Sequence, residues 1–372
     1  MRRIQPYIHQ LPTWPKFTWQ PATLERLLGA VRHQQGRLLG RLDSLGLELR
    51  AEATLQTLTL DVLKSSEIEG ELLPPASVRS SLAYRLGLDQ AGLPPVDRRV
   101  EGVVAMMLDA TQQAEAPLTA ERLFEWHHAL FPTGHSGLYP LRVGVWRTGP
   151  MQVVSGPMGR ERVHYEAPAA DGLAAQMQQF LTWFNAPLEM DPVLKAAIAH
   201  FWFITIHPFD DGNGRIARAI ADLQLARADG SAQRCYSMSA QIQAERQTYY
   251  DLLETSQRGP LDLTPWLTWF LQCLGRALTN AEQTLAQVLA TARFWEQHRL
   301  TPLTERQRRL VQRLLDGFEG KLTTSKWARM AKCSQDTAGR DIADLIDKGI
   351  LLKEGAGGRS TSYRLAPEET SY

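Results

Sequence analysis

Twelve residues, HPFDDGNGRIAR (His207 to Arg218), combine side chains that could bind a chain of phosphates and move a proton. Gly212 and Gly214 let the backbone approach a ligand closely, because glycine has no side chain. Asn213 and the glycine N–H groups open the next helix, where free N–H groups and the positive end of the dipole favour an anion. The spacing therefore predicts an anion site at the start of a helix.

The charged members of this stretch specify the chemistry further. Arg215 and Arg218 carry permanent positive charge, and a guanidinium binds phosphate oxygens in bidentate fashion. Asp211 offers a hard oxygen ligand for Mg²⁺, which commonly shares its shell with nucleotide phosphates. His207 can accept a proton near neutral pH. A calcium loop is the alternative for DDGNG, but the alternating acids of an EF-hand are absent, so we favour a triphosphate with Mg²⁺ and a base.

A second stretch, KSSEIEGELLPP at residues 64–75, predicts the end of a helix with an acid in its last turn. Gly70, Pro74 and Pro75 are stop signals. Glu69 is poorly placed there, because the dipole is negative at a helix C-terminus. Two explanations remain open from the residues alone: a solvated helix end, or a carboxylate that faces a cation from elsewhere in the chain.

Composition limits the class of protein, the number of domains and the partners that charge could attract. The chain has 372 residues, of which 44% are hydrophobic and 22% charged, and it carries 41 Lys and Arg against 40 Asp and Glu. This is ordinary globular composition, long enough for two or three domains. The near-zero net charge does not favour general attraction to nucleic acid or to anionic membranes, although a local basic face is compatible with it.

The cysteines and the N-terminus indicate the compartment. Cys235, Cys273 and Cys333 are far apart and form no metal-ligand spacing, which favours reduced thiols in a cytoplasmic protein. The first residues contain no apolar segment typical of a secretory signal, and no stretch has the length and apolarity of a membrane span. We therefore expect a cytoplasmic protein with no membrane partner.

Helices are expected on both sides of the glycine-rich motif. Apolar residues at helical spacing predict helices over residues 24–45, 51–68, 76–88, 96–114, 119–131, 171–186, 192–209, 249–259 and 263–298, and within 212–230. Residues 135–168 differ, because they are rich in glycine and proline. Within them, residues 151–156 and 160–168 predict two strands of a hairpin joined by GPMG.

The last residues predict a separate unit. From residue 304 the order is helix, helix, short turn, helix and then a hairpin with GAGG at its tip, which is typical of a winged helix-turn-helix. Gln335, Thr337 and Arg340 would lie at the start of a recognition helix, with Arg359 on the wing.

Acidic residues on that helix argue against DNA binding, and winged helices also dock proteins. The acids are Asp336, Asp341, Asp344 and Asp347.

The first motif resembles the signature of the Fic family, HPFx[D/E]GNGRxxR, with every fixed position present. SSEIEG, from Ser65 to Gly70, is similar to that family's inhibitory motif, [S/T]xxxE[G/N], and GVWR at residues 144–147 to the segment before its flap. The resemblance covers about residues 10–290. It implies a Fic-type helical core with a small β-hairpin flap and an N-terminal helical extension, and with the C-terminal winged helix-turn-helix predicted from the residue pattern we expect a mainly α fold. The expected domains are residues 1–95, 96–290 and 300–366.

The resemblance implies transfer of AMP from ATP to a Ser, Thr or Tyr hydroxyl of target proteins and of the chain itself, with release of pyrophosphate. His207 would be the general base, Asp211 would hold Mg²⁺, and Arg218 would bind the γ-phosphate. Asn213, Gly214 and Arg215 would surround the other phosphates. The implied nucleotide-binding set is Asp211, Gly212, Asn213, Gly214, Arg215, Arg218, Tyr249, Tyr250 and Gln257. For the last three residues, core packing is an equal alternative.

The resemblance also answers the question posed by the acidic helix end. It implies that Glu69 pairs with Arg218 and inhibits the enzyme, with Ser65 one turn earlier on the same helix face and Gly70 ending the helix. Glu67 and Glu71 are expected to lie off that face. Glu69 could instead orient a water for the removal of AMP.

The predicted flap would receive a target segment as an added strand, with Val163, His164 and Tyr165 at the contact. Exposure without a role is the alternative for His164. We interpret His200 as structural, and His127 and His128 have no obvious partner.

Other functions remain open. The chain could remove AMP, could transfer another phosphate-containing group such as UMP or phosphocholine, or could be a DNA-binding regulator. Fic relatives often form dimers, so the resemblance is compatible with a homodimer, although no feature of the sequence indicates one.

Overall fold

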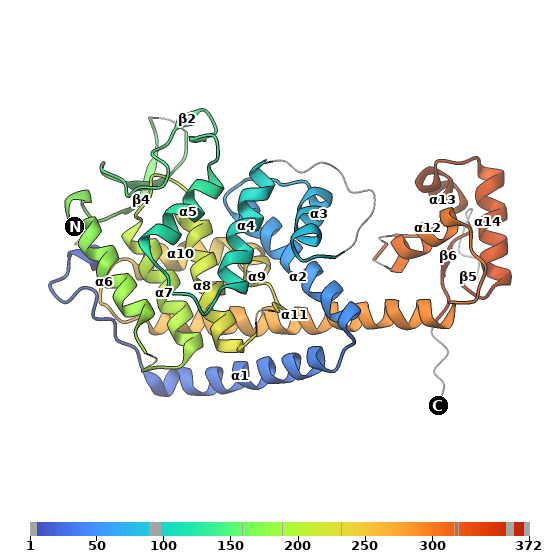
Figure 1. Ribbon diagram of the computed structural model, residues 1–372, viewed down its shortest axis with the longest axis horizontal. Helices are drawn as coiled ribbons and strands as arrows, with labels where there is room; N and C mark the ends of the chain where they lie inside the picture. The colour runs from blue at the N-terminus through green and yellow to red at the C-terminus, as the bar shows by residue number, and fades with distance from the viewer. Residues whose placement is uncertain are drawn as a thin grey trace. The chain divides into compact units, whose positions relative to one another are not determined.

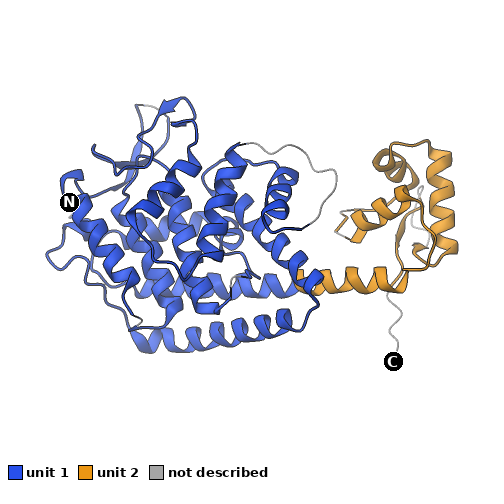
Figure 2. Ribbon diagram, in the orientation of Figure 1, with its two compact units in different colours: residues 1–283 blue, residues 284–372 orange. Residues whose placement is uncertain are grey.

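The computed structural model describes residues 6–88, 98–157, 159–187, 189–231, 233–315, 317–318, 320–354 and 361–367. It divides into two compact units, residues 1–283 and 284–372 (Figure 2). The fold is mainly helical, as predicted, and the strands of the described residues form three separate two-stranded pairs. The division falls within α11 (Thr264–Gln297). The domain ranges expected from the sequence stay predictions.

The first unit is built from helices around α7 and α8 (Figure 1). The elements before these two helices are η1 (Ile8–Gln10), α1 (Pro21–Asp43), α2 (Leu47–Ile68), α3 (Pro75–Arg85), α4 (Arg98–Gln112), α5 (Ala120–Leu130), β1 (His135–Ser136), β2 (Tyr139–Pro140), β3 (Gln152–Ser155), β4 (Arg162–Glu166), η2 (Ala170–Gly172) and α6 (Leu173–Asn185). The elements from there to α11 are α7 (Pro192–Ile206), α8 (Asn213–Asp229), α9 (Met238–Ala244) and α10 (Arg246–Ser256). The sequence did not predict α9.

Helix α7 is the core of this unit. Every residue from Val193 to Ile206 is buried, and α7 packs extensively against α8. Its sequence, PVLKAAIAHFWFITI, is apolar on nearly every side. A helix of this kind must be surrounded by protein. The helix starts at Pro192 because the Asp191 side chain accepts a hydrogen bond from the Val193 N–H at 2.8 Å. This cap fixes the N-terminal end of the buried helix.

Among its described residues, the second unit contains the last part of α11, three further helices and a hairpin. Its elements are α12 (Glu305–Leu315), α13 (Thr324–Ala331), α14 (Gln335–Asp347), β5 (Leu351–Lys353) and β6 (Tyr363–Leu365), with β5 antiparallel to β6. Trp327 is completely buried in its core, together with Val311 and Leu345. The described elements follow the order expected for a winged helix-turn-helix, whereas the GAGG tip and Arg359 lie outside the described residues.

Gly102 marks the closest approach of α4 to α5. A Cβ at this position would lie 1.7 Å from the carbonyl oxygen of Ala129. We expect Gly102→Ala to destabilise the protein by about 2–3 kcal/mol, because the backbones must separate to admit the methyl group. Gly29→Ala, in the exposed middle of α1 with no atom within 4 Å of its Cβ, should instead stabilise by about 0.5–1 kcal/mol. Chemical denaturation of both variants tests this, and equal effects would contradict the packing.

Candidate functional site

His207 ends α7 in the left-handed region, with φ 52° and ψ 60°. Its Nδ1 lies 3.1 Å from the carbonyl oxygen of Ile204. Since a carbonyl can only accept, Nδ1 carries the proton and Nε2 is the basic nitrogen of the neutral ring. The ring is therefore set in the tautomer that a general base needs.

Burial lowers the pKa of His207 to about 4, because an imidazolium ion loses its hydration there. Nearby Arg147 lowers this pKa further. The hydrogen bond to Ile204 and the negative charges of Glu69 and Asp211 oppose the shift without overcoming it. His207 is consequently neutral, and able to accept a proton, throughout the physiological pH range.

Arg147, from the GVWR segment, holds the backbone around His207. Its buried guanidinium donates from Nε to the carbonyl of His207 at 2.8 Å, from Nη1 to Gly149 at 2.8 Å and from Nη2 to Pro168 at 2.6 Å. Its own N–H donates to the carbonyl of Pro208 at 2.9 Å. One side chain thus joins the end of α7 to both ends of the β3–β4 hairpin.

The loop between α7 and α8 is shaped by Asn213. Its Oδ1 accepts from the Phe209 N–H at 3.0 Å, and its Nδ2 donates to the Phe209 carbonyl at 2.8 Å. Both ends of the Asn213 amide are therefore used within the loop. Gly212 precedes it with φ +80°, a conformation that favours glycine.

Asp211 is positioned by groups from three elements. Its Oδ2 accepts from the Ser136 hydroxyl at 2.5 Å and its Oδ1 from the Gly212 N–H at 2.6 Å. Its backbone carbonyl lies 3.2 Å from Nε2 of His127, whose Nδ1 accepts from the Gly144 N–H at 3.0 Å. The orientation of this carboxylate is therefore fixed.

His127, for which the sequence showed no partner, is a buried support of the loop. Its ring stacks on Phe209 with centroids 4.2 Å apart, and burial lowers its pKa to about 4. Neither His127 nor Ser136 is adjacent to the motif in the chain, so only the folded structure brings them to it.

Arg218 is held by the end of α2. Its Nη2 donates to Glu69 Oε1 at 2.8 Å and to the Ser65 carbonyl at 2.8 Å, and its Nε donates to the Ser65 hydroxyl at 3.0 Å. Glu69 also fills space above Gly214, where a Cβ would lie 2.1 Å from its Oε1. The absence of a side chain at 214 leaves the space that this carboxylate occupies at the start of α8.

Glu71 makes a contact that the sequence did not predict. We expected it to lie off the interacting face, but its Oε2 accepts from Nη1 of Arg215 at 2.8 Å. The expectation extended the helix periodicity beyond Ile68, where α2 has already ended.

The three expected nucleoside contacts lie in different environments. Tyr249 is buried, with its hydroxyl 2.9 Å from Nε2 of His200, and Gln257 is buried with its Nε2 donating to the Thr205 hydroxyl at 3.3 Å. Both side chains are buried, and their contact with a nucleoside stays a prediction. Tyr250 is only partly buried, and its hydroxyl lies 3.5 Å from the carbonyl of Ile68.

The β3–β4 hairpin carries the residues expected to meet a target. Val163 is exposed and pairs with Val154, which is also exposed. Tyr165 instead points into the core, where its hydroxyl donates to the Thr205 carbonyl at 2.7 Å, so its side chain cannot meet a target in this arrangement. The strand thus presents one of these two side chains to solvent and buries the other.

His164 connects the hairpin to α10. Its Nδ1 lies 2.6 Å from Glu254 Oε2, and its Nε2 lies 2.6 Å from the Ser155 hydroxyl. Arg162 donates to the same carboxylate at 2.7 Å. Glu254 therefore fixes the hairpin over α10, a role that the sequence did not indicate.

Two family models match the chain. Residues 7–88 match a domain of unknown function, DUF4172, and residues 117–225 match the Fic/DOC family. The second match includes all of α5, α6 and α7 and the whole of the His207–Arg218 motif.

The chain carries a Fic/DOC-family domain.

Curated proteins that are similar to this chain carry the name of the Fic family. Protein adenylyltransferase Fic of Drosophila willistoni is 26% identical over 286 residues, which cover 74% of this chain and 53% of the fly protein. The protein of the same name from Drosophila ananassae is 28% identical over 214 residues, covering 57% of this chain and 39% of the relative. The chain thus spans about half, or less, of the length of these relatives.

Solved structures show the same fold. A Fic family protein from Desulfovibrio desulfuricans G20 superposes with a TM-score of 0.54 at 21% identity, covering 96% of this chain and 99% of that one. A Fic domain containing signaling protein from Bacteroides thetaiotaomicron superposes with a TM-score of 0.51 at 20% identity, covering 69% and 97%. At these identities the likeness concerns the fold alone.

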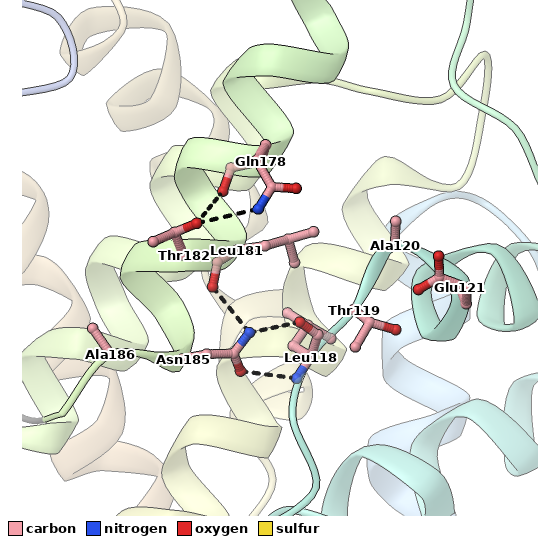
Figure 3. A pocket seen from close by; sticks show the side chains of 9 residues that line it. All are labelled: Leu118, Thr119, Ala120, Glu121, Gln178, Leu181, Thr182, Asn185 and Ala186. Carbon is pink, nitrogen blue, oxygen red and sulfur yellow. Dashed lines mark hydrogen bonds between the residues drawn. The ribbon is translucent and has the colours of Figure 1, made fainter.

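A surface groove of about 570 Å³ lies elsewhere on the Fic domain, between the start of α5 and the end of α6 (Figure 3). The Asn185 side chain in it is already bonded to Leu118 on both its oxygen and its nitrogen, and its nitrogen also donates to the carbonyl of Leu181. None of the motif residues lines this groove. It therefore does not compete with the start of α8 as the site.

Within the described part of the chain, no three His, Cys, Asp or Glu side chains gather into a metal cluster. No described helix combines the length and apolarity needed to cross a membrane.

We expect His207 to titrate near pH 4 when followed by NMR of the ¹⁵N-histidine-labelled chain. Its folded pKa lies below the unfolded value, so the neutral ring favours the folded state above pH 6.5, and this contribution is lost as pH falls towards 4. Glu69→Gln should lower the midpoint further, since the charge of Glu69 raises this pKa. His207→Ala assigns the resonance, and a midpoint near 6.5 would contradict the desolvated environment.

Proposed function

We propose that the chain is a protein adenylyltransferase, which moves AMP from ATP to a Ser, Thr or Tyr hydroxyl of target proteins and of itself. The observation that carries the proposal is the arrangement at the start of α8. A neutral histidine with a basic Nε2 precedes a helix N-terminus and two largely buried arginines. The curated relatives named protein adenylyltransferase Fic support the same activity.

The reaction would use His207 as the base. The target hydroxyl oxygen forms a bond with the α-phosphorus of ATP, the bond from that phosphorus to the bridging oxygen breaks, and pyrophosphate leaves. The hydroxyl proton goes to Nε2 of His207. Because its pKa is low, His207 is unprotonated and ready at neutral pH, although it is a weaker base than an ordinary histidine.

The residues at the start of α8 would bind the phosphates. Arg218 would contact the γ-phosphate and Arg215 the other phosphates, with the backbone N–H groups of Asn213 and Gly214 directed at oxygen atoms, whereas the Gly212 N–H is bonded to Asp211. The side chain of Asn213 would act by holding the loop.

A magnesium ion fits Asp211. Mg²⁺ is usually held by one or two carboxylates together with substrate phosphates, so a single fixed carboxylate beside an anion site is a suitable donor set. Such an ion would neutralise phosphate charge. Ser136 would keep the Asp211 carboxylate oriented toward it.

The observed conformation would be inhibited. Glu69 occupies the Arg218 guanidinium and sits directly over Gly214, so a γ-phosphate and this carboxylate compete for one cation. Removing Glu69 should free the arginine. A role of Glu69 in removing AMP, or transfer of UMP or phosphocholine, would show as other outcomes of the same experiment.

The test is transfer of label from α-labelled ATP to protein, with Mg²⁺, by the full chain. Glu69→Gly should raise labelling at least about tenfold, since a charged hydrogen bond of about 1.5–3 kcal/mol no longer holds Arg218. Glu69→Gly/His207→Ala should lose the labelling while still binding ATP. Absence of label from every variant, with ATP binding intact, would exclude AMP transfer and favour another donor or AMP removal.

DNA binding by the second unit is a second candidate, favoured by the position of its acids. Asp341 is buried and accepts from Arg306 at 2.7 and 2.8 Å, and Asp344 accepts from Lys348 at 2.5 Å. These two carboxylates are neutralised inside the unit, so they repel DNA less than the sequence suggested. Gln335 and Arg340 remain exposed on α14.

A gel-shift titration of the full chain with random duplex DNA tests this candidate. Binding should weaken as salt is added, and Arg340→Gln should reduce affinity about threefold to tenfold by removing a phosphate contact. Arg299→Gln, which removes an exposed arginine that precedes α12, is the matched control. Equal affinity for all three proteins, or no shift at low salt, would favour protein docking instead. A homodimer stays a prediction.

A further inference from the structure

The chain that leaves α2 places a second carboxylate against a second arginine. Glu71 Oε2 accepts from Arg215 Nη1 at 2.8 Å, next to the contact between Glu69 and Arg218. We propose that Glu71 and Arg215 form a second autoinhibitory contact, which must open in addition to the Glu69 contact before a triphosphate can occupy the start of α8. The inference rests on the proposed function of the site.

The turn at the end of α2 explains how both acids face α8. Gly70 has φ +83°, its N–H donates to the carbonyl of Glu67 at 2.9 Å, and the Glu71 N–H donates to the carbonyl of Ser66 at 3.0 Å. This pair of bonds is a Schellman motif, with glycine in the left-handed position after the C-cap. The left-handed residue redirects the chain, so residues 69 and 71 project to the same side. In a continued helix they would diverge by about 200°.

Burial is unequal within each pair. The side chains of Arg218 and Arg215 are 1% and 7% exposed, whereas those of Glu69 and Glu71 are 32% and 30% exposed. The arginines are part of the floor of the site, and Arg215 also lies over the Phe131 ring at 5.0 Å. The carboxylates lie on the solvent side. Opening the site therefore means withdrawal of the glutamates, while the cations stay in place.

Both arginines retain unused donors. Among the described residues, Nη1 of Arg218 and Nε of Arg215 are buried without a hydrogen-bond partner. A buried donor left unpaired is costly, so two carboxylates satisfy this pair of cations incompletely. A phosphate chain offers more oxygen atoms than two carboxylates contribute here. Each arginine is therefore a place where phosphate competes with a glutamate.

The two contacts involve different cations, so losing one leaves the other. With Glu69 removed, Glu71 still holds Arg215, which the mechanism assigns to the phosphates other than γ. Glu69→Gly alone should then give only partial activation.

Glu67 supplies a matched control in the same segment. Its carboxylate is bonded to Lys64 at 2.6 Å and to Gln243 at 3.2 Å, away from both arginines. Glu67 lies two residues before Glu69, and Glu71 lies two residues after it. Replacing Glu67 removes one negative charge without freeing Arg215 or Arg218.

The experiment compares the unaltered 372-residue chain with Glu71→Ala, Glu69→Gly, Glu69→Gly/Glu71→Ala and Glu67→Ala. Two quantities are measured: ATP affinity by calorimetry, and transfer of α-label to protein. Glu71→Ala should bind ATP about threefold to tenfold more tightly than wild type, and the double variant should transfer about tenfold more label than Glu69→Gly. Glu67→Ala should match wild type in both. Thermal unfolding shows whether each protein is folded. Glu71→Gln, which preserves shape, separates the loss of charge from the loss of side-chain volume.

The outcomes separate this inference from the proposed function. Unchanged affinity and labelling in Glu71→Ala, together with a double variant equal to Glu69→Gly, would overturn the second contact while leaving AMP transfer intact. Weaker ATP binding by Glu71→Ala would also overturn it, by showing that Glu71 positions Arg215 for the reaction. Tighter ATP binding without labelling in any variant would support the contact and refute AMP transfer.

Discussion

A guanidinium ion buried at the start of α8 must have an anion beside it. Arg218 is 1% exposed, and nearby Glu69 raises its pKa although burial alone would lower it. A buried charge without a partner is strongly unfavourable, so the site is stable either with the carboxylate in place or with a bound anion of another source. The end of α2, the glycine at 214 and the hydroxyl of Ser65 are all arranged around this requirement.

His207 and the two arginines differ in how they are held. His207 is fixed by the end of a fully buried helix, by its bond to Ile204 and by the bonds of Arg147 to the surrounding carbonyls. It is therefore preformed in the observed conformation. Under the proposed function, the arginines would exchange carboxylates for phosphates on activation, so control would act on how the nucleotide is placed rather than on proton transfer.

Much of this arrangement could be predicted from the sequence, because local rules decide it. The periodicity of α7, the stop signals after Ile68 and the glycines around Asn213 each act within a few residues. The supports of the site could not be predicted in this way. His127, Ser136 and Glu254 lie 84, 75 and 90 residues from their partners, and no spacing rule reaches so far. Glu71 was misplaced for a different reason, since the left-handed Gly70 reverses the direction that helix periodicity assigns.

The two sides of the Glu69–Arg218 contact come from different family matches. Glu69 lies in the segment that matches a domain of unknown function, residues 7–88, and Arg218 lies in the Fic/DOC match, residues 117–225. Under the proposed function, the segment that carries Glu69 would act as an inhibitor within the same polypeptide, and covalent linkage would set its effective concentration. At such an effective concentration, a contact that is weak in itself would suffice to keep Arg218 occupied. Under the proposed function, opening the site would then require withdrawal of the carboxylates but no departure of a second molecule.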